Sequence, residues 1–336
     1  MLNVDIGIDL GTDSLIIYAE GKGIVLEEPA VLAYDERKEK VVAVGRAAFD
    51  MLGKAPPHLR IVRPLEEGYI SDFYMAEVLL KTILLKVFGN MLFKPSIAMC
   101  VPSTVTGIER SAFVTTALNA GARKVTLIEA PLAAAIGCGI NFKEYKGNMV
   151  VNIGAGSTDI AVVSFGGVVS SVTERTGSYD MDNAIKEYVL KNKKLYIGQK
   201  TAETAKITAG TVFEPDENLV APLKGLSAVT QLPATDKINS DEICEAISPV
   251  AERITKAIHA LLEVTPPDLT GDILETGIIL TGGGALLRGI DKFISVRLGV
   301  KVTLADDPIH CVAIGTGSCF KVADDLIDAS FEHAEV

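Results

Sequence analysis

The 336-residue sequence contains few cysteines, and their spacing excludes two common kinds of site. None of the five belongs to a C-x-x-C pair, so the sequence predicts neither a structural zinc site nor a disulfide framework. We expect these thiols to be reduced and buried, as is usual in a cytosolic protein. The five cysteines are Cys100, Cys138, Cys244, Cys311 and Cys319.

The sequence also lacks a long apolar run, low-complexity segments and an excess of positive charge. No stretch approaches the roughly 20 apolar residues that a membrane-spanning helix requires. Residues 1–9 run directly into an apolar strand, without the basic flank or cleavage site of a signal peptide. The formal charge of -11 disfavours a nucleic-acid partner, because binding to its backbone depends on clustered Lys and Arg. These absences predict an ordered, soluble, cytoplasmic protein.

Apolar periodicity in the first half indicates strands followed by alternating strands and helices. Asp72 is expected to cap the first turn of the helix whose apolar face begins directly after it. Gly121 stands where a left-handed residue ends the helix over 106–120. Such alternation is typical of a parallel or mixed sheet covered by helices. The expected strands are 4–9, 15–18, 24–26, 31–34, 41–44, 97–101 and 124–128, and a short helix is expected over 132–136.

The second half begins with the same kind of hairpin, and a chain of this length suits two lobes. A long helix over 241–264 stops at Pro266 and Pro267, because proline cannot continue the helical hydrogen bonds. The acidic segment 324–336 is expected to be a helix end or a free tail. The expected strands are 149–154, 160–165, 168–172, 277–280 and 300–304, the helices 181–191, 202–209, 290–298 and one from 309, and turns with edge strands occupy 215–236.

Three glycine-rich loops, 9–14, 154–159 and 281–285, each follow an expected strand. Glycine and small hydroxyl residues let backbone N–H groups approach phosphate oxygens closely, and a nearby carboxylate such as Asp9 can hold the waters of Mg²⁺. None of the loops is a P-loop, and the first lacks the dinucleotide fingerprint. One such loop alone is most simply a tight turn, but three at strand ends predict a phosphate clamp in one cleft.

The three loops, in this order, resemble those of the actin, Hsp70 and sugar-kinase superfamily, and further runs resemble the MreB-type bacterial actins over about residues 4–320. The resemblance implies an α/β, actin-like fold of two lobes. Each lobe would hold a mixed five-stranded, ribonuclease H-like sheet with helices, and two small subdomains would be added. The similar runs are 7–12, 21–26 with 28–29, 127–129 with 131–137, 181–182, 201–203 with 206, 280–289, 307–308 with 311–313, and 315–317. The implied subdomains are IA (1–32, 66–145 and 310–336), IB (33–65), IIA (146–181 and 240–309) and IIB (182–239).

The same resemblance implies ATP or ADP with Mg²⁺ as cofactors, and it assigns roles by position. Asp9 would hold Mg²⁺ through water, with a weakened contribution from Asn152, while Glu129 and Thr158 would orient the attacking water. Without the resemblance, Glu203 and Lys206 would be interpreted as an ordinary solvated pair on a helix. The implied nucleotide contacts are Gly11, Thr12, Asp13, Ser14, Gly154, Ala155, Gly156, Ser157, Glu203, Thr204, Ala205, Lys206, Gly282, Gly283, Gly284 and Ala285.

Four residues depart from the family pattern near the phosphates. Asn152 stands where the second phosphate loop normally opens with Asp, so one charge that would help to hold Mg²⁺ is missing. Ala155 replaces a loop glycine, Asp13 adds a negative charge, and Ala130 stands where a second Glu often follows Glu129. We therefore expect nucleotide binding with a weak or slow Mg²⁺-dependent ATPase.

A membrane contact and a polymer also follow from the resemblance. Met91, Leu92 and Phe93 form an apolar loop beside Lys94. The three apolar side chains either pack into the core under the loop or, as in the resembling family, dock on the bilayer with help from Lys94 and Lys86. The family implies homopolymer filaments on the inner face of the cell membrane, with membrane proteins of the shape or motility machinery as partners. Two alternatives stay open, namely a small-molecule kinase and a nucleotide-gated scaffold that does not hydrolyse ATP.

Overall fold

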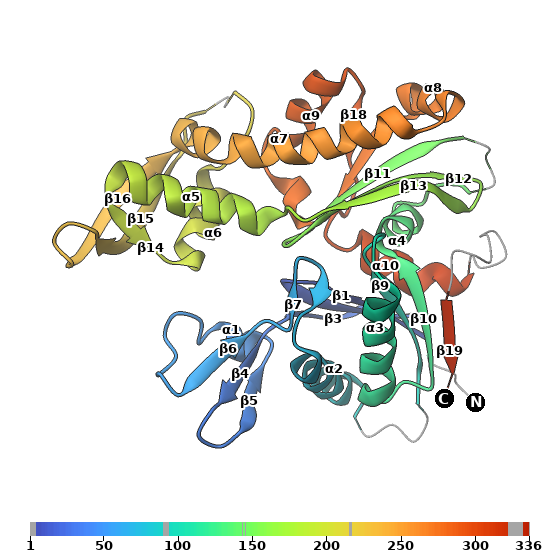
Figure 1. Ribbon diagram of the computed structural model, residues 1–336, viewed down its shortest axis with the longest axis horizontal. Helices are drawn as coiled ribbons and strands as arrows, with labels where there is room; N and C mark the ends of the chain where they lie inside the picture. Colours follow the sequence, from blue (N-terminus) through green and yellow to red (C-terminus); the bar gives the residue numbers. More distant parts are fainter. Residues whose placement is uncertain are drawn as a thin grey trace.

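The chain forms two lobes, which Figure 1 shows one above the other. The first lobe begins with β1 (Asp5–Leu10), is interrupted after α4 (Ala130–Gly137), and resumes with α10 (Cys311–Ser318) and a last strand, β19 (Glu332–Glu335). The second lobe runs without interruption from β11 (Asn148–Ile153) to β18 (Val302–Leu304). The computed structural model describes residues 5–89, 94–142, 144, 146–214, 217–321 and 332–335.

The central sheet of the first lobe has the strand order β19-β10-β9-β1-β2-β3. It is a mixed sheet, because β1 pairs antiparallel with β2 and parallel with β9. The sixth strand, β19, pairs antiparallel with β10, so this sheet has one strand more than the expected five. It corrects the expectation of a helix end or free tail for residues 332–335, while the rest of the segment 324–336 lies outside the described residues. Backbone groups of β19 make the ladder along an otherwise open sheet edge. The other strands are β2 (Ser14–Ala19), β3 (Gly23–Pro29), β9 (Ser96–Val101), β10 (Lys124–Glu129) and β19 (Glu332–Glu335).

Two helices, α2 (Phe73–Phe88) and α3 (Gly107–Ala120), pack on this lobe where the sequence predicts them. The side chain of Asp72 accepts a hydrogen bond from the backbone of the first turn of α2 at 3.0 Å. Thr106 caps α3 in a reciprocal capping box, and Gly121 ends it with a φ of 117°. The predicted start of α2 and the predicted end of α3 are thus confirmed, and α3 begins one residue later than predicted.

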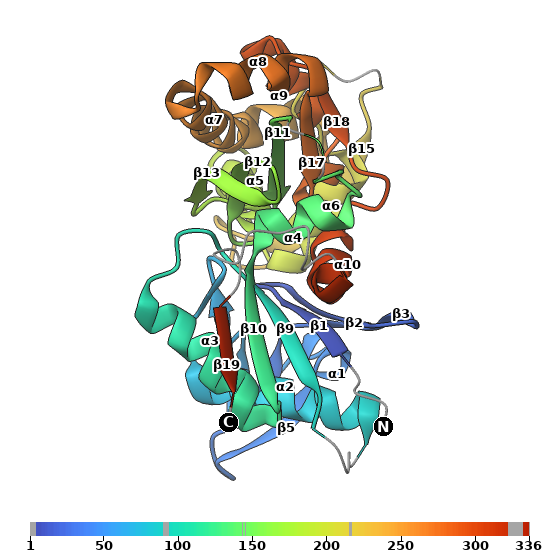
Figure 2. The ribbon, with the colours of Figure 1, turned by 90° about the vertical axis from the view of Figure 1, so that its right-hand side faces the viewer.

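Helices α4 and α10 lie side by side between the two lobes (Figure 2). Their backbones are in direct contact, because a Cβ atom on Gly315 would lie 1.7 Å from the carbonyl oxygen of Ala133. Likewise, a Cβ atom on Gly137 would lie 1.9 Å from the carbonyl oxygen of Cys311. Glycine is therefore required at both crossing points, and the apolar cluster around α4 contains residues from both lobes.

The outer part of the first lobe is a separate three-stranded sheet in the order β5-β4-β6, followed by a short hairpin. The hairpin brings the chain back toward the cleft between the lobes, where Gly68 lines the cavity described below. Helix α1, strand β6 and this hairpin were not predicted, since each is too short to show an apolar period. The elements are β4 (Leu32–Asp35), β5 (Lys40–Val44), α1 (Arg46–Phe49), β6 (Leu59–Val62), β7 (Leu65–Glu66) and β8 (Tyr69–Ile70).

The central sheet of the second lobe has the order β13-β12-β11-β17-β18 and repeats the arrangement of the first. Its first strand, β11, pairs antiparallel with β12 and parallel with β17, as β1 does with β2 and β9. A second three-stranded sheet, β14-β15-β16, forms the outer part of this lobe. The exact boundaries of the four subdomains stay a prediction. The strands are β12 (Thr158–Ser164), β13 (Gly167–Glu174), β14 (Leu195–Ile197), β15 (Val220–Ser227), β16 (Pro233–Asn239) and β17 (Ile278–Thr281).

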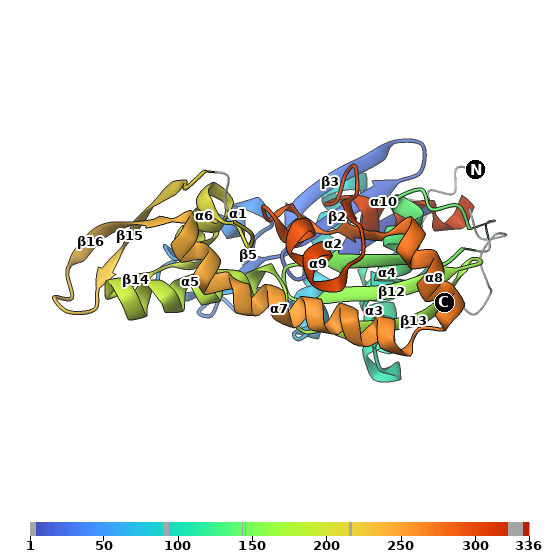
Figure 3. The same cartoon turned by 90° about the horizontal axis from the view of Figure 1, so that it is seen from above.

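The long helix α7 (Ser240–Val264) runs along the second lobe (Figure 3) and packs on its core with Ile243, Ile247, Ile254 and Ile258. The proline pair ends α7 as predicted, but a further helix, α8, follows it where no element was expected. A proline at the first helical position loses no hydrogen bond, because the N–H at that position has no partner within the helix. Pro267 can therefore start α8 although the proline pair ends α7. The remaining elements are α5 (Ser178–Lys193), α6 (Gln199–Ala209), α8 (Pro267–Thr276), the 3-10 turn η1 (Gly283–Leu286), α9 (Ile290–Leu298) and the 3-10 turn η2 (Cys319–Lys321).

Candidate functional site

A cavity of about 530 Å³ lies between the lobes, where β1, β11 and β17 end. Its size suits a small organic ligand. Most of the residues predicted from the three glycine-rich loops line it, although those loops are far apart in the sequence. The lining residues with a predicted role are Asp9, Gly11, Thr12, Asp13, Ser14, Asn152, Gly154, Ala155, Gly156, Ser157, Glu203, Lys206, Gly282, Gly283 and Gly284.

The first two loops have the same backbone geometry. The N–H group of Gly11 donates to the carbonyl oxygen of Ser14 at 2.9 Å, and that of Gly154 donates to the carbonyl oxygen of Ser157 at 2.8 Å. In each loop, four residues separate the last paired residues of the two antiparallel strands, which are Leu10 and Leu15 in the first lobe and Ile153 and Thr158 in the second. The hairpins expected at the start of each half of the sequence therefore carry two equivalent turns that face one cavity from opposite lobes.

The two loops are also in contact across the cleft. A Cβ atom on Gly156 would lie 2.8 Å from the hydroxyl oxygen of Thr12 and 2.9 Å from the backbone nitrogen of Glu67. That hydroxyl already accepts a hydrogen bond from the N–H group of Gly68 at 2.9 Å. Any side chain at position 156 would push the loops apart, so glycine is needed for this close approach.

The third loop lies against the end of β11. Gly282 has a φ of 83°, and a Cβ atom there would lie 2.3 Å from the carbonyl oxygen of Ile153. A Cβ atom on Gly284 would lie 2.4 Å from the side chain of the same isoleucine. The loop thus reaches the cavity because β17 is the parallel neighbour of β11 and because two glycines allow it to lie flat.

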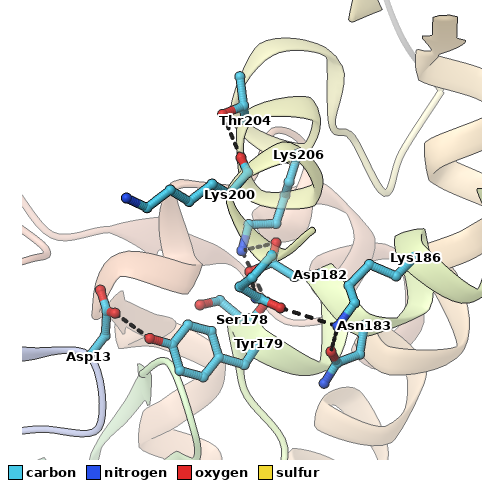
Figure 4. A network of polar contacts seen from close by, with 10 residues as sticks. Asp13, Ser178, Tyr179, Asp182, Asn183, Lys186, Lys200, Thr204 and Lys206 are labelled. Atoms are coloured by element: carbon cyan, nitrogen blue, oxygen red, sulfur yellow. Dashed lines mark hydrogen bonds and ion pairs between the residues drawn. The ribbon is translucent and has the colours of Figure 1, made fainter. Parts of the chain in front are cut away.

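Helix α6 forms one wall, and Lys206 on it is held in place rather than solvated. Its ammonium group forms an ion pair with Asp182 at 2.8 Å and donates to the carbonyl oxygen of Ser178 at 2.9 Å (Figure 4). The side chain is only 12 % exposed. Burial raises the pKa of Asp182 to about 6, against the opposing effect of Lys206. The interpretation of Glu203 and Lys206 as an ordinary solvated pair is therefore wrong for the lysine.

Three residues predicted as nucleotide contacts do not line the cavity. Thr204 is exposed and donates its hydroxyl to the carbonyl oxygen of Lys200 at 2.7 Å. Ala205 and Ala285 are buried in the core of the second lobe. The helical period explains the first two, because residues directly after Glu203 point to other faces of α6.

The two residues predicted to orient water lie beside the cavity, not on its lining. Glu129 ends β10, and one of its carboxylate oxygens is 3.9 Å from Arg110. Burial raises the pKa of Glu129, with Ser103 and Arg110 acting in the opposite direction. Thr158 is fully buried and donates its hydroxyl to the carbonyl oxygen of Thr176 at 2.7 Å.

Asp159 lines the cavity although it had no predicted role. It stands directly opposite Asn152 in the β11–β12 ladder and accepts a hydrogen bond from the hydroxyl of Thr173 at 2.7 Å. Burial raises its pKa to about 6, and the nearby charges of Glu129 and Asp9 add to the effect. The pairing register, which follows from the four-residue loop, is the signal that would have identified it. Other lining residues without a predicted role include Gly68, Met181, Ile207, Gly210, Leu287 and Arg288.

The oxygen atoms at this end of the cavity fit a hydrated Mg²⁺ ion. Asp9 and Asp159 both line this end, and burial raises the pKa of both carboxyl groups, so a bound cation would favour their ionised forms. Asn152 adds an amide oxygen, which accepts a hydrogen bond from the hydroxyl of Thr281 at 3.3 Å. Carboxylate and amide oxygens are the ligands that Mg²⁺ prefers, usually together with several waters. Within the part of the chain that the structure describes, no three His, Cys, Asp or Glu side chains are grouped to hold a metal ion by themselves.

Comparison with known proteins identifies the family. Residues 3–328 match the family model described as MreB/Mbl protein. The chain belongs to the MreB/Mbl family. It is 43 % identical to the cell shape-determining protein Mbl of Bacillus cereus, covering 96 % of this chain and 97 % of that protein. It is 41 % identical to the cell shape-determining protein MreB of Escherichia coli K12, with coverage of 96 % and 95 %.

Solved structures agree with this assignment and with the actin-like fold. The chain is similar to MreB 5 of Spiroplasma citri bound to AMPPNP, with a TM-score of 0.91, 35 % identity, and coverage of 96 % of this chain and 98 % of that one. The same protein bound to ADP gives a TM-score of 0.91 at 36 % identity, with coverage of 96 % and 97 %. A MamK double helical filament shares the fold, with a TM-score of 0.78 at 21 % identity and coverage of 96 % and 99 %. The predicted α/β, two-lobed actin-like fold is thus confirmed.

The apolar loop of the membrane prediction, Met91, Leu92 and Phe93, lies outside the described residues. Of the two lysines beside it, Lys86 forms an ion pair with Glu28 and so is already engaged. Among the helices of the described ranges, none has the length and apolar character needed to span a bilayer.

Proposed function

We propose that this member of the MreB/Mbl family binds ATP and ADP in the inter-lobe cavity, forms filaments, and takes part in determining cell shape. The observation that carries the proposal is the pair of equivalent loops that face one cavity from opposite lobes. The relatives give it further support, since the Spiroplasma citri structures contain AMPPNP and ADP and the two bacterial relatives are cell shape-determining proteins.

The residues around the cavity suggest how the nucleotide would be held. Backbone N–H groups of 12–14 and 155–157 would bind the phosphates, because glycine and small side chains let them approach closely. The flat glycine loop at 282–284 and the α6 wall with Glu203 and Lys206 would enclose the nucleoside. The buried Lys206–Asp182 ion pair would keep that wall rigid.

Asp9, Asn152 and Asp159 would hold the water shell of Mg²⁺, and the bound ion would neutralise phosphate charge. Asn152 contributes a dipole where the family pattern has a charge, so we expect weaker Mg²⁺ binding and slow hydrolysis. Glu129 would orient the attacking water from beside the cavity, and Thr158 would help to fix the second loop. Burial raises the pKa of Glu129, so a fraction of it would be protonated at a higher pH than usual.

Filaments and a position on the inner face of the cell membrane complete the proposal. Like subunits stacked head to tail without closure would form a homopolymer. The loop around Met91, Leu92 and Phe93, with the exposed Lys94 beside it, would contact the bilayer. Membrane proteins of the shape or motility machinery would be the other partners.

Asn152 favours a second candidate, a nucleotide-gated scaffold that polymerises without hydrolysing ATP. The small-molecule kinase has no such support, because the relatives reported above are cell shape-determining proteins. The two remaining candidates share nucleotide binding and filaments, and they differ in phosphate release.

Sedimentation with ATP, ADP or no nucleotide, with and without anionic vesicles, tests the proposal when phosphate is followed in the same samples. We expect ATP-dependent pelleting that vesicles increase, with slow phosphate release. Asn152→Asp should raise phosphate release and its dependence on Mg²⁺, while Asn152→Gln is the matched control without a charge. Protein that stays in solution under every condition would refute the filament. Pelleting with no phosphate release, even in Asn152→Asp, would favour the scaffold.

A further inference from the structure

Asp13 lies in the first glycine-rich loop, but its carboxylate is bound by two protein side chains. Arg63 donates to its Oδ1 atom at 2.9 Å. The hydroxyl of Tyr179 donates to the same oxygen (Figure 4). The guanidinium group of Arg63 also lies 5.0 Å from the centroid of the Tyr179 ring, within the range of a cation–π contact. The three side chains therefore form one connected group.

This group joins the two lobes at the loops themselves. Asp13 belongs to the loop after β1, and Arg63 precedes the β7–β8 hairpin, so both are in the first lobe. Tyr179 is in the first turn of α5 in the second lobe, and its backbone N–H donates to the carbonyl oxygen of Ala155 at 2.9 Å. The contact between Asp13 and Tyr179 thus connects one four-residue loop directly to the other.

The charges in the group are matched. A carboxylate this close to a polyphosphate would repel it, and the guanidinium group of Arg63 neutralises that charge. The side chain of Arg63 is 21 % exposed and that of Asp13 is 41 % exposed, so solvent weakens this pair in part, but less than a pair whose two side chains are both mostly exposed. Burial raises the pKa of Tyr179 far above its ordinary value, with the charge of Asp13 adding to the effect, so the phenol keeps the proton that it donates.

A second ion pair between the lobes differs from this group. Arg175 lies 3.3 Å from Glu67, but both side chains are more than half exposed, and neither lines the cavity. Exposed pairs of this kind contribute little. The Arg175–Glu67 pair provides a matched control, because it also joins the two lobes but involves neither Asp13 nor Tyr179.

We propose that Asp13, Arg63 and Tyr179 form a clamp between the lobes that fixes the separation of the two phosphate loops, with Asp13 as a positioning residue. The inference rests on the proposed function in one respect, namely that the phosphates lie between these loops. Two consequences follow from it. The clamp slows nucleotide release, because it holds the two loops around the phosphates, and Arg63 allows a carboxylate to stand beside the phosphates.

The clamp itself is tested without nucleotide, by hydrogen–deuterium exchange of the full chain. Tyr179→Phe keeps the ring and removes the donor, so amides at 154–157 and 178–181 should exchange faster than in the wild type. Tyr188→Phe is the matched control, because Tyr188 is on the same helix and donates to Glu245 within the second lobe. Unchanged exchange in Tyr179→Phe would overturn the clamp, as would an equal change in Arg175→Gln.

The charge-matching part is tested with fluorescent ATP and ADP analogues. Tyr179→Phe should release both nucleotides on the order of tenfold faster, the effect of one lost hydrogen bond to a charged group. Arg63→Gln should weaken ATP binding more than ADP binding, most strongly at low salt, and Asp13→Asn in the same chain should restore it. A double variant as weak as Arg63→Gln alone would overturn the assignment of Arg63. A wild type that binds neither nucleotide would refute the proposed function, while the exchange experiment would still decide whether the clamp exists.

Discussion

The contact between α4 and α10 makes a prediction about a single methyl group. Gly315→Ala would place a Cβ atom 1.7 Å from the carbonyl oxygen of Ala133 and 2.9 Å from the backbone nitrogen of Gly137. Ordinary contact begins near 3.4 Å, and backbone atoms cannot rotate away as a flexible side chain can. The two helices must therefore move apart at the centre of the molecule, and the cluster that joins the lobes must repack.

The size of the effect can be worked out from two opposing terms. Overpacking of a well-packed core costs about 1–3 kcal/mol, and a clash with backbone belongs at the upper end of that range. Alanine is favoured over glycine inside a helix by about 1 kcal/mol, which leaves a net loss of about 2 kcal/mol. Unfolding entropy of about 2.1 cal/mol/K per residue over 336 residues converts this loss into a lower melting temperature by about 3 °C.

Thermal and urea unfolding of the nucleotide-free protein would measure the change, with Gly271→Ala as the control. Gly271 is also inside a helix, α8, but a Cβ atom there would meet nothing within 4 Å. This control should therefore gain stability, by about 0.5–1 kcal/mol. The reasoning fails if Gly315→Ala is as stable as the wild type, or if both variants shift in the same direction.

Three further predictions concern residues at the edges of the cleft. Burial lowers the pKa of His310, but Asp307 and Glu27 outweigh it and raise that pKa above 6.5. The stability that His310 contributes is therefore complete below about pH 6 and is lost as the pH rises through the raised value, so His310→Gln should flatten the melting temperature between pH 6 and 8. Arg288 donates to three carbonyl groups at the end of α6, at 2.7, 2.8 and 3.2 Å. Arg288→Lys loses the planar guanidinium that makes these bonds together, so it should weaken ADP binding about tenfold in a titration. Lys200 donates to the backbone carbonyl of Phe49 in the opposite lobe at 2.8 Å, so Lys200→Met should speed proteolysis of the outer sheets. Lys194 donates to a carbonyl of its own helix, so Lys194→Met should leave proteolysis unchanged.

Features set by neighbours in the sequence could be predicted without the structure. The caps at Asp72 and Thr106 act within one helical turn, so the residues that determine them lie side by side in the sequence. The two hairpin loops could be predicted for the same reason, because four residues in each make the turn. Most of the cavity lining follows from these loops and from the resemblance that orders them.

Features set by distant pairing could not be predicted in this way. Asp13 and Tyr179 are 166 residues apart, and Asp13 and Arg63 are 50 apart, so no local period brings them together. The pairing of Asp159 with Asn152 requires the hairpin register, and β19 requires an open sheet edge. In these cases the backbone arrangement decides which side chains meet, and composition carries no sign of it.

The order of the two lobes along the chain has a consequence for synthesis on the ribosome. The second lobe is one uninterrupted stretch, so all of its strands and helices are available before α10 is made. The first lobe waits for α10, which lies in backbone contact with α4 and packs against β1, where a Cβ atom on Gly7 would lie 2.2 Å from the backbone of Gly317. The part of the protein that is synthesised first is thus the part that can be completed last. The face of its sheet that α10 covers, and the edge that pairs with β19, stay uncovered while the whole of the other lobe emerges.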